Sequence, residues 1–249
     1  MKKTIVLAAL ILSTALSTYA QQQAEREGNF TFRIIDNGRA VEITEYVGSN
    51  ADVRIPERIQ KLPVTVIGEK AFVGGELVHD GEDLVFIAGN HLTSISIPSS
   101  VTHIGDSAFW ANQLTSVSIG SGVTHIGAAA FAENLLSRVN IPESIMHIGN
   151  TAFADNQLTS VSIGSSVTNI DDSAFAENLL SSVSIPDSVT HIGDEAFEDN
   201  QLTSVSIGSG VRHIGAKAFT GNRLSSVSVP SGAFVDPQAF DEDVQITRR

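Results

Sequence analysis

Residues 112–120 read NQLTSVSIG, and the same nine residues recur unchanged at 156–164 and at 200–208. Each copy begins 44 residues after the previous one. The segment carries no charge and consists of Leu, Val and Ile separated by small or polar residues. Its repetition therefore points to structure rather than to chemistry, and we interpret it as one corner and one strand of a coil that the chain builds again and again.

A shorter period of 22 residues runs through most of the chain. Three columns of residues keep this step: Phe109, Phe131, Phe153, Phe175, Phe197 and Phe219; Leu92, Leu114, Leu136, Leu158, Leu180, Leu202 and Leu224; Asn90, Asn112, Asn134, Asn156, Asn178, Asn200 and Asn222. A fixed period in this range is typical of stacked coils that bury their apolar sides on one another. The sequence therefore predicts a right-handed repeat solenoid of about eight coils.

The first part of each coil has the alternation of a β-strand. In the copy at 114–119, Leu114, Val117 and Ile119 are expected to point inward, while Ser116 and Ser118 point outward. Strands from successive coils should pair in parallel at a spacing of roughly 4.8 Å. Gly and Pro then alternate strictly at the turn that follows, which gives 44 residues as the length of two alternating coils.

The second part of each coil should close it. The segment VTHIG (123–127) predicts a second short extended piece, and AAAFAEN (128–134) is long enough for one helical or 3₁₀ turn that buries Phe131. The column of Asn lies at the next corner, where its side chains can bond otherwise unpaired backbone groups from coil to coil.

The ends of the chain depart from the period. The segment 30–46, FTFRIIDNGRAVEITEY, is typical of a β-hairpin cap in which Asn37 and Gly38 take positive φ. We divide the chain as follows: signal peptide 1–20, linker 21–29, N-terminal cap and first irregular repeat 30–72, insert 73–91, tandem repeats 92–224, last repeat and C-terminal cap 225–249.

Composition restricts the class of partner. Residues 1–20 have two lysines, a short apolar run and a final Ala20, which is typical of a secretory signal peptide and predicts a secreted, cell-surface or periplasmic protein. No apolar run is long enough to span a membrane. The net charge of −13 and the absence of a basic cluster argue against nucleic acid, and the absence of cysteine excludes disulfides and zinc–thiolate sites.

The repeating unit resembles a known family. The segment LTSISIPSSVTHIGDSAFWAN (92–112) is similar to the BspA-like bacterial leucine-rich repeats, and VEITEYVGSNADVRIPERIQKLPVTVIGEKAF (41–72) resembles the unit that opens such arrays. Asn stands where many relatives carry Cys. The resemblance implies a secreted or surface-exposed protein that binds proteins or host surfaces, and it implies no catalytic residues.

Two repeated columns contain residues capable of chemistry. The first comprises His103, His125, His147, His191 and His213, and the second Glu133, Asp155, Glu177 and Asp199. Both could in principle hold a metal ion, but duplication copies a solvated surface residue as readily as a ligand. A catalytic triad needs one oriented set of residues rather than a repeated column. We therefore expect no catalytic residues, no metal site and no cofactor.

The outward positions of the strands form a face rich in hydroxyl groups. Serine fills almost all of them, and Arg138 and Asn140 are the exceptions. A regular hydroxyl lattice could meet an ordered surface such as ice or a glycan, although serine also simply keeps a strand soluble.

Departures from the period are better candidates for a binding site. About fifteen residues are inserted after Phe72, in the segment GGELVHDGEDLVFIAG (74–89). Insertions in repeat arrays usually emerge as loops on one face and often bind partners. The predicted binding residues are Leu84, Val85 and Phe86 of the insert, the single Trp110, and Arg138. The alternative is a hairpin that only covers the core at an imperfect coil.

These observations predict a non-catalytic binding module for a protein or glycan partner, of the adhesion or envelope-interaction type. The main alternative is a structural spacer without a specific ligand. An enzyme or an ordered-surface binder is a more distant alternative.

Overall fold

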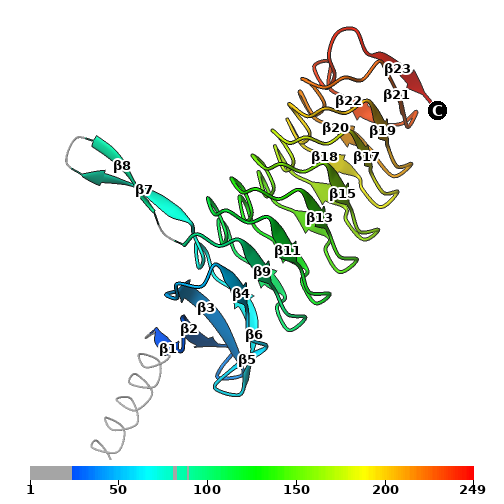
Figure 1. Ribbon diagram of the computed structural model, residues 1–249. Coiled ribbons are helices and arrows are strands. Elements are labelled where there is room, and N and C mark those ends of the chain that lie inside the picture. Colours follow the sequence, from blue (N-terminus) through cyan, green and yellow to red (C-terminus); the bar gives the residue numbers. More distant parts are fainter. Residues whose placement is uncertain (1–23, 81–82, 89) are drawn as a thin grey trace, which may run out of the picture.

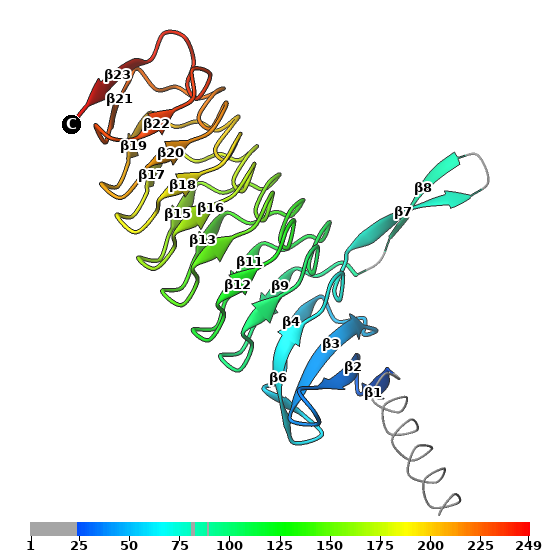
Figure 2. The same cartoon turned by 180° about the vertical axis from the view of Figure 1, so that it is seen from behind.

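The computed structural model describes residues 24–80, 83–88 and 90–249, with the side chains of 76–89 outside the description. The chain forms a right-handed solenoid of about nine turns, one more than the sequence predicted. Antiparallel strands cap its N-terminal end (Figures 1 and 2). The repeat solenoid and its N-terminal hairpin cap are thus confirmed. The signal peptide predicted at 1–20 lies outside the described residues.

Each coil contributes one short strand to each of two sides of the solenoid. On one side lie the serine strands: β4 (Asp52–Arg54), β9 (Ser94–Ser96), β11 (Ser116–Ser118), β13 (Arg138–Asn140), β15 (Ser160–Ser162), β17 (Ser182–Ser184), β19 (Ser204–Ser206), β21 (Ser226–Val229) and β23 (Gln245–Arg248). On the other lie the histidine strands: β6 (Leu62–Ile67), β10 (His103–Ile104), β12 (His125–Ile126), β14 (His147–Ile148), β16 (Asn169–Ile170), β18 (His191–Ile192), β20 (His213–Ile214) and β22 (Phe234–Val235).

The histidine strands form the continuous sheet of the molecule. They pair in parallel from β6 to β22, and together with the N-terminal strands they make a sheet of twelve strands. The register places Ile104 beside Ile126, and Ile126 beside Ile148. These isoleucines are buried, while the histidines before them alternate to the outside. The second extended segment, predicted at VTHIG, therefore lies on the side of the solenoid where the strands of successive coils pair without interruption.

The serine strands, where the sequence predicted the parallel sheet, pair only in groups. One sheet contains β4, β9 and β11, and the other groups are β13 with β15, β17 with β19, and β21 with β23. Within a group the main chain is bonded at both ends, as in Thr115 N to Thr93 O at 2.9 Å and Ile97 N to Ser118 O at 2.9 Å. Strand pairing stops between these groups, so the coils pair in twos after a first group of three.

From β9 onward, the groups follow the alternation of Pro and Gly at the corner after each serine strand. A Cβ on Gly120 would lie 2.5 Å from the carbonyl carbon of Pro98, so only glycine allows this coil to approach the one before it. At the start of the next group, Pro142 has no N–H to donate to the preceding coil. Pro98 lacks this donor too, but β9 still pairs with β4, so proline alone does not end the pairing. From β9 onward, the 44-residue period of the sequence is also the period of strand pairing.

Stacked phenylalanines fill the interior. The eight rings that follow one another from Phe72 to Phe240 have centroids 5.0–5.4 Å apart along the solenoid. The six predicted members of the column are completely buried. Leucine, valine and isoleucine surround this stack, as the sequence predicted.

The asparagine corner works as predicted, because its side chains replace backbone bonds between coils. Asn156 is buried, its Oδ1 accepts from Leu136 N at 3.0 Å, and its Nδ2 donates to Phe131 O at 3.0 Å. The same pattern occurs at Asn112, Asn134, Asn178, Asn200 and Asn222.

The helical or 3₁₀ turn predicted at 128–134 is not found, and no helix occurs in the residues that the structure describes. The segment forms turns instead, with Ala129 and Glu133 both at φ 53°. A left-handed residue interrupts a right-handed helical turn, and the two such residues of this coil lie on either side of the buried Phe131.

The N-terminal cap is an antiparallel unit. β1 (Glu25–Glu27) pairs with β2 (Phe30–Ile35), and β2 pairs with β3 (Ala40–Tyr46). The β2–β3 turn has positive φ at Asn37 and Gly38, as predicted, and also at Asp36. β3 then pairs in parallel with β6, to which β5 (Arg58–Ile59) also pairs. The linker predicted at 21–29 thus contains a strand, because residues 25–27 bond to the hairpin.

Candidate functional site

The insert forms a hairpin that leaves the solenoid. β7 (Gly75–Asp80) and β8 (Asp83–Ala88) pair antiparallel over six residues each, from Gly75 opposite Ala88 to Asp80 opposite Asp83. Figures 1 and 2 show the hairpin extending away from the coils. The predicted contacts Leu84, Val85 and Phe86 concern side chains outside the described part, so they stay predictions.

Trp110 lies at the root of this hairpin. Gly74 N donates to Trp110 O at 2.7 Å, and a Cβ on Gly74 would lie only 1.8 Å from Ala111 O. The chain therefore needs glycine where it leaves the coil. The Trp110 side chain is half-buried. The structure thus places Trp110 next to the base of the insert, and its role in binding stays a prediction.

Arg138 lies elsewhere. It is exposed on β13, two serine strands beyond β9, and its register partner is Ser160. Figure 1 shows β13 apart from the hairpin. Within the described residues the Arg138 guanidinium has no hydrogen bond or ion pair. The structure therefore divides the predicted site residues between the hairpin root and the serine face.

The histidine column is solvated, as the sequence predicted. The rings of His103 and His125 stack with centroids 4.5 Å apart and 6° between their planes. Thr102 Oγ1 donates to Thr65 O at 3.0 Å, so it accepts a hydrogen bond from His103 Nδ1 at 2.8 Å, which leaves Nε2 facing solvent. The described residues contain no group of three or more His, Asp or Glu arranged for a metal ion.

The stacked rings make stability depend on pH. Burial first, and the charge of His125 second, hold the pKa of His103 below its usual value. The folded chain therefore binds this proton less readily than the unfolded chain does. The contribution of neutral His103 to the free energy of unfolding is therefore fully present above the unfolded pKa of about 6.5. It decreases as the pH falls below that value.

We expect His103→Asn to reduce this loss, because Asn169 already occupies the same column without a charge. The measurement is the thermal midpoint of both proteins from about pH 7 to pH 5. Equal losses of stability in the two proteins would show that the His103–His125 stack has no effect.

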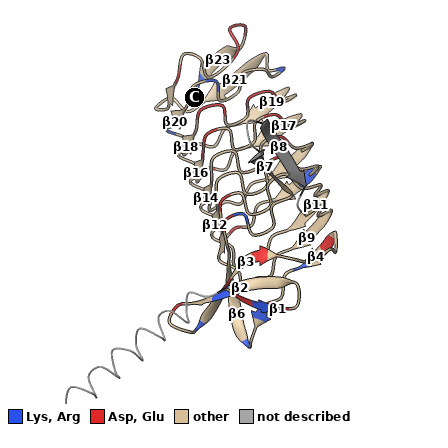
Figure 3. Ribbon diagram, turned by 90° about the vertical axis from the view of Figure 1, so that its left-hand side faces the viewer, with Lys and Arg blue, Asp and Glu red and all other residues tan. Residues whose placement is uncertain are grey.

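The acidic column is a solvated edge. Glu133, Asp155, Glu177 and Asp199 are exposed, and each has a φ between 50° and 53°. The Asp155 carboxylate raises the pKa of Glu177, first because it accepts a hydrogen bond from the protonated Glu177 and second through its negative charge. Acidic residues also recur along the turns of the solenoid (Figure 3). The column therefore consists of repelling carboxylates held on left-handed turn residues.

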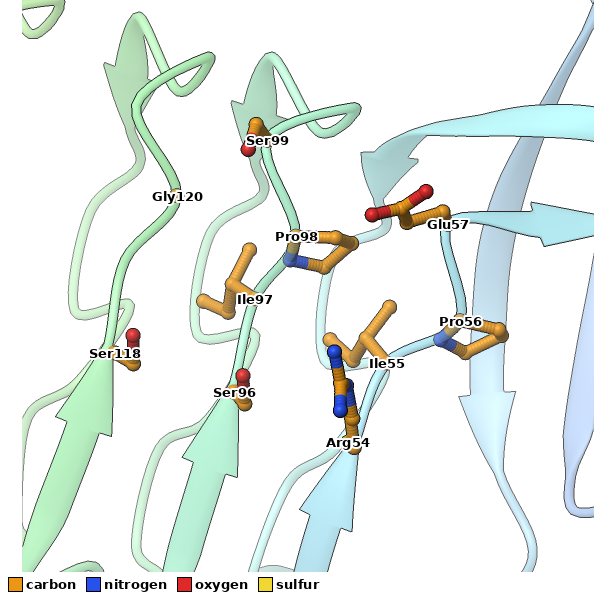
Figure 4. A pocket seen from close by; sticks show the side chains of 10 residues that line it. All are labelled: Arg54, Ile55, Pro56, Glu57, Ser96, Ile97, Pro98, Ser99, Ser118 and Gly120. Atoms are coloured by element: carbon orange, nitrogen blue, oxygen red, sulfur yellow. The ribbon is translucent and has the colours of Figure 1, made fainter.

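The structure adds one feature that the sequence did not indicate. A groove of about 580 Å³ crosses the first three serine strands and the turns that follow them. Arg54, Ser96 and Ser118 are register partners in β4, β9 and β11, and Figure 4 shows their side chains on the same side of these strands. Glu57 and Pro98 lie at its upper edge in that view. Their spacing in the sequence is irregular, because the 73–91 insert separates β4 from β9.

The described part of the chain contains no helix with the length and hydropathy of a membrane-spanning segment.

Comparison with known proteins identifies the repeat. The family described as BspA type Leucine rich repeat region matches in six copies, over residues 82–179 and 124–247. No curated protein is significantly similar in sequence to the chain.

Three solved structures show the same fold. The leucine-rich repeat protein TpLRR of T. pallidum is 24% identical, with a TM-score of 0.54 over 88% of this chain and 92% of that chain. The pneumococcal vaccine antigen PcpA is 15% identical, with a TM-score of 0.57 over 91% and 88%. A leucine rich cell surface protein of Faecalibacterium prausnitzii is 23% identical, with a TM-score of 0.53 over 91% and 76%.

The family match covers well over half of the chain, and the asparagine corner, the phenylalanine stack and the parallel coils are its structural counterpart. The chain belongs to the BspA-type leucine-rich repeat family.

Proposed function

We propose that the protein is a non-catalytic binding module, secreted or displayed at the cell surface, that engages a protein or glycan partner. The observation that carries the proposal is the hairpin β7–β8, which departs from an otherwise regular array and extends away from it (Figure 1). A projection of this kind does not contribute to the stack of coils, so it needs another reason to persist.

The residues of the hairpin support a role in binding. The sequence of β8, with Leu84, Val85 and Phe86, places apolar residues on an element that stands apart from the core, and Trp110 lies at its root. Aromatic side chains bury a large area and concentrate binding energy. Arg138 would serve as a separate contact on the serine face.

Two further observations support the class of function. Each column of Ser, His, Asp or Glu repeats along the solenoid, whereas an enzyme requires one oriented set of groups. A surface location is supported by the signal-like residues 1–20 and by the cell surface protein of F. prausnitzii, which shares the fold. Adhesion is the activity that we propose for this location.

The test is deletion of residues 75–88. Gly75 and Ala88 are opposite each other in the ladder, at about 5 Å, so the chain can be rejoined across the gap without moving the coils. We expect the deletion to abolish saturable binding to partners captured from host or envelope extracts. The thermal midpoint should stay close to that of the full chain.

A point variant gives the matched control. Trp110→Ala should weaken the same binding, while Leu179→Ala, at an exposed position of the array, should not change it. A structural spacer predicts no saturable partner for the full chain. If the deletion unfolds the coils and binding follows stability alone, the hairpin is a cap of the core and the proposed site is wrong.

A further inference from the structure

The groove on the first three serine strands is formed by residues that do not belong to the proposed hairpin site. Its floor is the row Arg54, Ser96 and Ser118, and Ile55 and Ile97 close it from below because both are buried. Arg54 is the first residue of a column that is otherwise serine, asparagine or threonine, so the groove contains the column's single charge.

The charged groups of the groove are not paired with each other. Within the described residues, neither the Arg54 guanidinium nor the Glu57 carboxylate makes a hydrogen bond or an ion pair. The N-terminal cap shows what a paired contact looks like in this protein, because Arg33 Nε lies 2.6 Å from Glu42 Oε2. Arg54 and Glu57 thus keep their donors and acceptors for something else.

In later coils, the acidic residue at the same position accepts hydrogen bonds from a serine of the next coil; we call such a corner closed. Glu143 follows Pro142 as Glu57 follows Pro56, and its Oε2 accepts from Ser165 N at 2.8 Å and from the Ser165 hydroxyl. Asp187 after Pro186 bonds Ser209 in the same way, with 2.6 Å to the backbone N. The equivalent bond from Ser99 to Glu57 is not made.

Proline at position 98 distinguishes this corner from the closed ones. Where an acidic corner is closed, the next coil carries glycine, and a Cβ on Gly164 would lie 2.5 Å from Pro142 O. The coil after Pro56 carries Pro98 instead, and both prolines line the groove. The groove therefore lies at a corner where the bond between the acidic residue and the serine of the next coil is not made.

The polar groups that this opening leaves fit a neutral sugar. A guanidinium presents several donors in a fixed fork, a carboxylate presents acceptors, and the hydroxyls of Ser96, Ser99 and Ser118 do both. Vicinal sugar hydroxyls can accept hydrogen bonds from the guanidinium and donate them to the carboxylate. The rings of Pro56 and Pro98 can contact the C–H face of the sugar. An anionic ligand would meet Glu57 and a net charge of −13.

We propose that the groove lined by Arg54, Glu57, Ser96 and Ser118 binds a neutral saccharide. This site is separate from the hairpin and does not depend on the function proposed for it.

The test uses the full chain and four neutral sugars as probes: lactose, mannobiose, cellotriose and triacetylchitotriose. Saturation-transfer NMR should show that at least one of them binds. Arg54→Ala and Glu57→Gln should each weaken that binding by roughly tenfold or more, as expected for hydrogen bonds to charged groups. Pro98→Gly should weaken it as well, because the corner can then close on Glu57.

The chain provides matched controls. Glu143→Gln removes the equivalent carboxylate of a closed corner and should leave sugar binding unchanged, as should deletion of residues 75–88. The proposal is overturned if none of the four sugars binds, if binding survives Arg54→Ala, or if a glucuronic-acid oligosaccharide binds in preference to them. Loss of partner binding in the hairpin deletion with sugar binding intact would separate the two sites.

Discussion

Replacement of Phe153 by alanine is expected to lower the free energy of unfolding by about 3–5 kcal/mol. Phe153 is completely buried, and its ring lies between those of Phe131 and Phe175, with centroids 5.2 and 5.4 Å away. The coil of Phe153 is bonded to the coil before it through Asn156 and to the coil after it through the main chain, so these coils cannot close around the cavity without losing those bonds. The cavity should therefore remain largely open.

Chemical denaturation at neutral pH measures this loss. Leu135→Ala is the control, since Leu135 belongs to the same part of the array but is 41% exposed, and its loss should stay within about 0.5 kcal/mol. An unchanged midpoint for Phe153→Ala would contradict the assignment of the phenylalanine column to the core. A loss much smaller than about 3 kcal/mol would show that the coils relax into the space.

The core was predictable because each coil can bury its apolar side only on its neighbours. A 22-residue step in Phe, Leu and Asn therefore fixes which residues face inward, and the structure buries all six predicted phenylalanines. The asparagine corner followed from the same logic, since a corner leaves backbone groups that need partners.

The pairing of coils in twos was not predicted, although the sequence contained its signal. Alternation of Pro98 and Gly120 was visible, but its meaning depends on how close two corners approach, and this distance is a property of the assembled coils. The turn at 128–134 was mistaken for a helical one for a related reason. Non-glycine residues such as Glu133 take positive φ there, and neither composition nor periodicity indicates this.

The two candidate sites differ in how well the sequence alone could locate them. An insertion that breaks a period is visible by counting, so the hairpin could be located from the sequence alone. The groove could not, because Arg54 and Glu57 lie before the insertion while Ser96 and Ser118 lie after it. Their proximity depends on β4 pairing with β9 across a step of 42 residues, from Arg54 to Ser96.

Asn156→Ala is expected to cost about 2–4 kcal/mol, because a buried group left without its partner costs about 1–3 kcal/mol. The change removes the acceptor of Leu136 N at 3.0 Å and the donor to Phe131 O, Phe153 O and Ala154 O at 3.0–3.2 Å. Chemical denaturation measures the loss, and Gln157→Ala at the exposed neighbouring position should change stability by no more than about 0.5 kcal/mol.

Asn156→Asp separates the bonding role of this side chain from its size. The carboxylate would keep an acceptor for Leu136 N but would face the three carbonyl oxygens that Nδ2 now contacts. At pH 7 this variant should therefore be less stable than Asn156→Ala. Burial and the carbonyl groups would raise the folded pKa of the introduced carboxyl, so the stability of the variant should increase as the pH falls towards the unfolded value of about 3.9. Equal stability of the Asp and Ala variants at both pH values would mean that the corner needs only the volume of asparagine, and the bonds between coils would then have to be assigned to the main chain alone.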